Sequence, residues 1–117
     1  MPELKNDVHI KEEIDKLNEE ALKAANNDIT LAKELLDKAQ SLAKEVSYHK
    51  GLARNYYLYG YYYLRISKFD EAKEITDEAY SIYENLGEKA GMGHCYNNYG
   101  GVYLYKSDFK KALENYQ

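Results

Sequence analysis

The sequence predicts an all-α protein built from repeated pairs of antiparallel helices, about six helices in all. Three observations carry this prediction: a self-similarity at a lag of forty residues, apolar side chains that recur every three or four positions, and a single proline, Pro2. Apolar residues at that spacing form one face of a helix, and helices that contain no proline can be long. With 117 residues, the chain can build one domain with a real core.

The self-similarity is strongest between residues 51–77 and 91–117, where ten of the twenty-seven aligned positions are identical. The identical pairs are Gly51/Gly91, Tyr56/Tyr96, Tyr59/Tyr99, Gly60/Gly100, Tyr63/Tyr103, Leu64/Leu104, Ser67/Ser107, Phe69/Phe109, Ala72/Ala112 and Glu74/Glu114. Similarity at one fixed lag is typical of repeat proteins. We therefore expect one domain over residues 1–117, with repeats at about 8–47, 50–86 and 90–117, the last of them truncated.

The first two helices are expected over about residues 6–26 and 29–47. Their apolar faces are Ile10, Ile14, Leu17, Ala21, Ala24 and Ala25, followed by Ile29, Ala32, Leu35, Leu36, Ala39, Leu42, Ala43 and Val46. Asp28 lies between them and can cap the second helix, because an aspartate side chain accepts a hydrogen bond from the first turn.

The next pair is expected over about 50–66 and 69–86, with the break at Ser67-Lys68. Gly87 can end the second of these helices, because glycine adopts the left-handed conformation without a steric penalty.

The last pair is expected over about 89–106 and from 109 to the end. Its break is placed at Ser107-Asp108, one lag of forty after Ser67-Lys68. The chain then ends before this helix reaches the length of its counterpart, so we expect a fragment of a longer protein or an end that another chain covers.

The repeated unit resembles a tetratricopeptide repeat. The motif residues are Tyr56-x2-Tyr59-Gly60-x2-Tyr63, Phe69-x2-Ala72 and Ala79, then Tyr96-x2-Tyr99-Gly100-x2-Tyr103, Phe109 and Ala112, with Leu17, Ala21 and Ala24 in a degenerate first copy. The small residues allow two helices to approach closely. The period is forty rather than about thirty-four residues, no closing proline is present, and tyrosine replaces the usual Trp and Leu. Repeats of this length resemble those of bacterial signalling proteins, such as peptide-sensing regulators, sensor kinases and diguanylate cyclases.

The resemblance implies a right-handed α-solenoid in which the first helix of each pair lines a concave groove that binds a protein or peptide. The residues expected in this groove are Arg54, Tyr57, Tyr61, Arg65, His94, Asn97, Asn98 and Tyr105. Tyr57 and Tyr61 could instead be covered by neighbouring repeats. Asn98 could grip a ligand's backbone through its carboxamide or bond to a neighbouring turn. The Lys/Asn/Arg set that some members use for a C-terminal carboxylate is not present.

Composition and motifs disfavour the other function classes. The net charge is −4, which argues against nucleic acid as a partner, and there is no apolar run long enough to cross a membrane. His9, His49 and His94 are too dispersed for a metal site, and Cys95 is expected to be a small buried side chain. We expect no enzyme activity, no cofactor and no metal, and the polar start of the chain predicts a cytoplasmic location.

Two alternatives stay open. The repeats could serve mainly for self-association, with a homo-oligomer formed through the last helix. The residues expected to form that contact are Phe109, Ala112, Leu113 and Tyr116. Single-stranded RNA could stack on Tyr57 and Tyr61 beside Arg54 and Arg65, although the acidic balance disfavours this reading.

Overall fold

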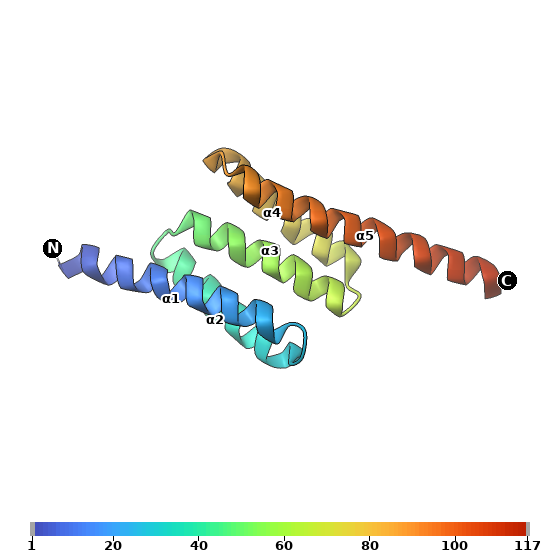
Figure 1. Cartoon of the computed structure of the whole chain (residues 1–117), viewed down its shortest axis with the longest axis horizontal. Helices are drawn as coiled ribbons and strands as arrows, with labels where there is room; N and C mark the ends of the chain where they lie inside the picture. The colour runs from blue at the N-terminus through green and yellow to red at the C-terminus, as the bar shows by residue number, and fades with distance from the viewer. Residues whose placement is uncertain (1, 117) are drawn as a thin grey trace.

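The computed structural model describes the backbone of residues 2–116 and the side chains of residues 7–111, 113 and 114. The described residues form five α-helices and no strand (Figure 1). The helices are α1 (Pro2–Ala24), α2 (Ile29–Glu45), α3 (His49–Arg65), α4 (Phe69–Leu86) and α5 (Lys89–Tyr116). The all-α prediction is confirmed for this part of the chain, and the first four helices lie close to their expected bounds.

Each helix packs against the next, and α3 also contacts α1 and α5. Within the described residues α2 and α4 do not contact each other, so α1, α3 and α5 lie on one side of the arrangement and α2 and α4 on the other (Figure 1). The molecule is elongated, with principal extents of 66 × 31 × 18 Å. This is a helical-repeat-like architecture, in which neighbouring elements supply the core.

Left-handed residues end the second, third and fourth helices. Ser47, Ser67 and Gly87 have φ angles of 53°, 61° and 70°. In each turn the next backbone N–H donates to a carbonyl five residues earlier; the pairs are Tyr48–Ala43, Lys68–Tyr63 and Glu88–Tyr83, at 2.8–2.9 Å. This bonding is the Schellman motif, which satisfies carbonyls at a helix end. The prediction for Gly87 is confirmed, and Asp28 caps α2 by accepting a bond from the Leu31 N–H at 3.1 Å.

The prediction of six helices is wrong for the described residues, because Ser107 and Asp108 lie within α5 rather than in a turn. Extending a helix adds one hydrogen bond per residue, whereas a new helix must be nucleated and then stabilised by packing. The turn at Ser67 is supported by the whole of α4 folding back on α3. Residues 109–116 make up only about two helical turns, too few to offset a comparable turn.

Small residues are found where helices approach most closely, as the motif predicts. Ala72 and Ala79 of α4 are fully buried. A Cβ on Gly60 would lie 2.3 Å from Thr76 Oγ1 of α4 and 2.6 Å from Asn98 Nδ2 of α5. Gly100, the copy of Gly60, has nothing within 4 Å of the equivalent position. The two repeat copies therefore differ: Gly60 lies at a contact between helices, whereas Gly100 lies on an open surface of α5.

This difference predicts opposite effects of one substitution at the two copies. Gly60→Ala should lower the free energy of unfolding by about 1–3 kcal/mol, because the added methyl overpacks a three-helix contact. Gly100→Ala should raise it by up to about 1 kcal/mol, because alanine favours an exposed helix over glycine. Urea unfolding followed by circular dichroism measures both. Equal effects at the two positions would contradict the assigned packing.

Candidate functional site

The candidate site lies on the face shared by α1, α3 and α5. Arg54 of α3 donates two hydrogen bonds to Glu19 Oε1 of α1, from Nε at 3.1 Å and Nη2 at 2.9 Å. Its guanidinium carbon lies 5.3 Å from the centroid of the Tyr57 ring, within cation–π range. The Tyr57 ring is in turn 5.3 Å from the ring of His94 on α5. Side chains from three helices thus form a continuous row, called here the Arg54–Tyr57 row: Glu19, Arg54, Tyr57 and His94.

Two further predicted residues extend this face toward the turn between α1 and α2. The Tyr61 hydroxyl donates to Asn26 Oδ1 at 2.7 Å. Arg65 is exposed and lines a shallow pocket together with Asn26 and Ile66. Tyr57 and Tyr61 are half-buried, so neighbouring helices cover these tyrosines in part and leave an edge of each ring accessible.

On α5, His94 and Asn97 are exposed, but Asn98 is not. Asn98 is only 3% exposed, and its Nδ2 donates to the Tyr57 carbonyl at 2.9 Å and to Thr76 Oγ1 at 3.2 Å. The expectation that Asn98 faces the groove is therefore wrong. The physical reason is visible in its repeat counterpart Leu58, which is also buried: this helix position faces the preceding helix pair.

Tyr105 lies away from the row. Its ring stacks on Phe69 at the start of α4, with centroids 5.7 Å apart and an interplanar angle of 10°. Phe109 contacts the same Phe69 ring at 5.5 Å. Tyr105 therefore belongs to an aromatic cluster along the second half of α5 rather than to the groove in which it was expected.

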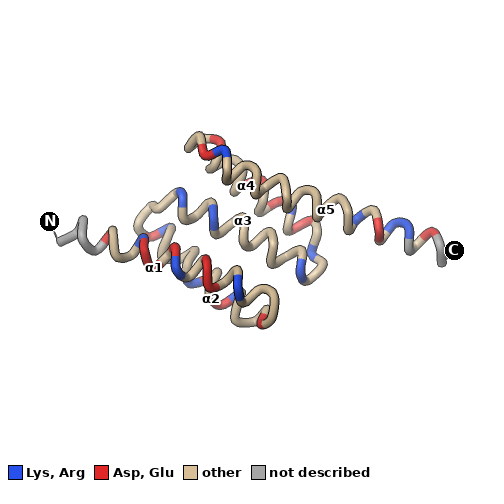
Figure 2. The backbone as a smooth tube through the Cα atoms, in the orientation of Figure 1, with Lys and Arg blue, Asp and Glu red and all other residues tan. Residues whose placement is uncertain are grey.

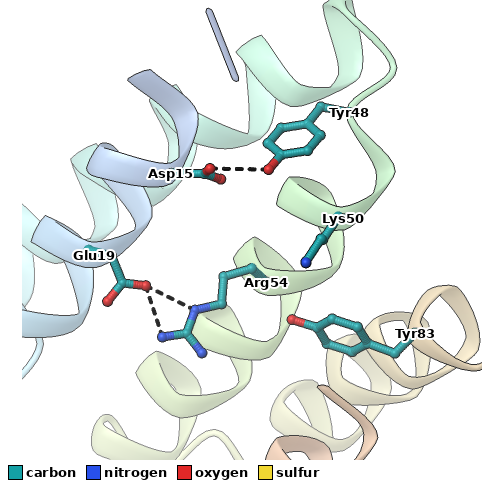
Figure 3. Close-up of a pocket in the computed structure, with 6 residues that line it drawn as sticks. All are labelled: Asp15, Glu19, Tyr48, Lys50, Arg54 and Tyr83. Atoms are coloured by element: carbon teal, nitrogen blue, oxygen red, sulfur yellow. Dashed lines mark hydrogen bonds and ion pairs between the residues drawn. The ribbon is translucent and has the colours of Figure 1, made fainter. Parts of the chain in front are cut away.

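A pocket of about 260 Å³ opens at the end of the row, beside the N-terminal part of α3 (Figure 3). Its lining residues are Asp15, Glu19, Tyr48, Lys50, Arg54 and Tyr83. We call it the Arg54 pocket. The Tyr48 hydroxyl donates to Asp15 Oδ2 at 3.1 Å, and Lys50 Nζ lies 3.5 Å from Glu88 Oε1. The Tyr83 side chain comes from α4 and points its hydroxyl into the pocket (Figure 3).

Two glycines leave the space that the tyrosine rings of the pocket occupy. A Cβ on Gly51 would lie 2.4 Å from the Tyr48 ring, and one on Gly91 would lie 2.2 Å from the Tyr83 ring. Each ring thus rests on a helix backbone that has no side chain at that point. Of the six pocket residues, the sequence predicted only Arg54. The identity of Gly51 and Gly91 at the forty-residue lag was the available signal that a bulky group approaches both helices.

Charges of opposite sign face each other across the α1–α3 boundary. α1 carries both acidic and basic residues, with the acidic ones in the majority, whereas the charged residues of α3 are all basic: Lys50, Arg54 and Arg65 (Figure 2). Burial raises the pKa of Tyr83 to about 12 against the opposing effect of Arg54. Burial, and then the bond to Asp15, raise the pKa of Tyr48 to about 12. Both hydroxyls are therefore protonated at neutral pH and can donate hydrogen bonds.

The remaining candidates from the sequence are the cysteine, a metal site and a membrane span. Cys95 is fully buried, as expected, and burial raises the pKa of its thiol to about 11. Among the described residues no group of three or more His, Cys, Asp or Glu side chains could hold a metal ion. In the same part of the chain, no helix combines the length and apolar character that a membrane span requires.

No protein-family model, no curated protein and no solved structure matches this chain. The structure itself defines an all-α fold with a helical-repeat-like arrangement, in which α1, α3 and α5 form one face.

The raised pKa values predict a loss of stability at alkaline pH. Tyr83, Tyr48 and Cys95 ionise at higher pH in the folded chain than in the unfolded chain, where their pKa values are near 10, 10 and 9. The stabilisation linked to these protons is complete below about pH 8 and declines as pH rises from about 9 toward 12. Urea midpoints measured from neutral pH to about pH 10.5 should be flat and then fall, less steeply in Tyr83→Phe. A constant midpoint over this range would contradict the burial of these groups.

Proposed function

We propose that this chain is a non-catalytic module that binds a protein or peptide on the face of α1, α3 and α5. The observation that carries the proposal is the Arg54–Tyr57 row, in which side chains of three helices touch one another and leave polar and aromatic edges accessible. Stacked repeats commonly recognise partners through such a composite surface. The finer reading is a right-handed tetratricopeptide-like solenoid that serves as the cytoplasmic regulatory part of a bacterial signalling protein.

The row is suited to binding because it is largely preorganised. Arg54 is fixed by two bonds to Glu19, and Tyr57 is held between Arg54 and His94. Ordering side chains on binding costs free energy, so residues that are already fixed lose less. Tyrosine and arginine are also the side chains that most often dominate protein interfaces.

The proposal predicts which exposed residues affect binding without affecting the fold. Peptides of about twelve residues would be selected from a random library on the intact chain, and their affinities measured by fluorescence anisotropy. The double change Arg65→Ala and Asn97→Ala should weaken the selected peptides about five-fold or more, a loss of roughly 1 kcal/mol. Lys44→Ala, an exposed charge on α2, is the matched control and should change the affinity less than about two-fold.

A library that yields no binder would contradict the proposal. So would peptides that bind the wild-type chain, the double variant and the control with equal affinity.

Self-association through α5 is the second candidate. Large apolar side chains on the second half of this helix are exposed: Tyr103 61%, Leu104 59%, Phe109 55% and Leu113 63%. In α3 the copies of Tyr103 and Leu104, Tyr63 and Leu64, are partly buried beside the neighbouring helices. A second copy of the chain would cover the α5 face in the same way. Two of the four residues expected at this contact, Ala112 and Tyr116, have side chains outside the described set.

Light scattering across a dilution series tests this candidate. A dimer through α5 should dissociate as the concentration falls, and Phe109→Ala with Leu113→Ala should shift the chain to monomer at all concentrations, because these residues supply the exposed apolar area. Arg65→Ala should leave the mass unchanged. A monomer at every concentration would exclude self-association and leave peptide binding as the function.

A further inference from the structure

We propose that the Arg54 pocket binds a small zwitterion, a molecule that carries an ammonium and a carboxylate on the same carbon atom, as free α-amino acids do. This goes beyond the proposed binding of a macromolecule on the Arg54–Tyr57 row. Four of the six pocket residues lie outside the row: Asp15, Tyr48, Lys50 and Tyr83.

The acidic wall of the pocket has unused acceptors. Asp15 accepts a bond from Tyr48 through Oδ2, and Glu19 accepts both Arg54 bonds through Oε1. Within the described residues the other oxygen of each carboxylate accepts no hydrogen bond. An ionised carboxylate has about four acceptor sites, so this wall can receive the three N–H donors of an ammonium group.

The basic wall has unused donors. Two of the five N–H donors of Arg54 are bonded to Glu19. Among the described side chains, Lys50 has one ion-pair partner, Glu88 at 3.5 Å. The Tyr83 hydroxyl makes no hydrogen bond to any described residue, and it is not one of the fully buried polar atoms, so it is open to the pocket (Figure 3). An accessible hydroxyl of this kind can donate to a ligand that enters the pocket. A ligand carboxylate lying between Lys50, Arg54 and Tyr83 would satisfy these donors together.

The charges of the pocket decide between ligand classes. Two carboxylates on α1 face two cationic side chains on α3, so the charged lining sums to zero. A simple anion would be repelled by Asp15 and Glu19, and a simple cation by Lys50 and Arg54. A dipolar ligand places one charge against each wall. The pocket volume of about 260 Å³ lies below the range of drug-sized sites, which favours a ligand of amino-acid size.

The test is an NMR titration of the intact ¹⁵N-labelled chain with L-alanine as the probe. Propionate, which lacks the ammonium, and ethylamine, which lacks the carboxylate, are the single-charge controls. Alanine should shift the amide signals of the α1–α3 boundary around Lys50 and Arg54 in a saturable way. The two controls should bind about ten-fold more weakly or not at all.

Tyr83→Phe removes the hydroxyl but keeps the ring and should weaken alanine binding about five-fold. Tyr80→Phe is the matched control, because its hydroxyl contacts Tyr96 outside the pocket, and should leave the affinity unchanged. No saturable shift, equal binding of either control ligand, or an unchanged affinity in Tyr83→Phe would overturn the proposal. Since Arg65 and Asn97 lie outside the pocket, the peptide-binding test stays independent of this result.

Discussion

The arrangement depends on the burial of α3, which contacts each of the four other helices. This is achieved because the helix carries a glycine at its tightest contact: α4 and α5 both approach Gly60, and a methyl group there would overlap Thr76 and Asn98. Tyr59 and Tyr62 fill the space on the other side of the helix against Ala21 and Leu36. Because α3 is narrow at Gly60 and carries large tyrosine rings on its other side, it can pack closely against helices on both sides.

Buried asparagines fix the positions of α1 and α5 relative to this centre. Asn18 of α1 donates to the Gly51 carbonyl at 3.1 Å, and Asn55 of α3 donates back to Asn18 Oδ1 and to the Leu36 carbonyl. Asn98 makes the corresponding connection from α5 to the Tyr57 carbonyl. Apolar contacts alone tolerate sliding, whereas a buried amide must find its partner. These bonds hold the helices in the register that brings Glu19 to Arg54 and His94 to Tyr57.

The sequence predicted those features of the fold that depend on residues close together in the chain. Helical spacing placed the first four helices, Gly87 marked a left-handed helix end, and Gly60 and Ala72 marked close packing. The continuous α5 was missed, because a Ser-Asp pair is compatible with either a turn or a helix and only packing decides between them. Asn98 was misplaced for a related reason, since an asparagine serves equally well as a ligand contact or as a buried helix contact. The pocket could not be predicted, because it combines residues of α1, α3 and α4 whose meeting depends on the register of three helices.

The described residues form two surfaces of different kinds: the face of α1, α3 and α5 that carries the Arg54–Tyr57 row, and the exposed apolar side chains on the second half of α5. The row joins α1, α3 and α5, whereas the Arg54 pocket combines residues of α1 and α3 with Tyr48 before α3 and Tyr83 of α4. Tyr103 of α5 is 61% exposed, whereas its copy Tyr63 in α3 packs against the core cluster that contains Ala21 and Leu36. Under the proposed function, a partner would bind on the face of α1, α3 and α5, and a second copy would cover the exposed apolar side chains of α5. His94 of the row lies in the first half of α5 and the exposed apolar side chains lie in its second half, so the two proposed roles use different parts of the helix.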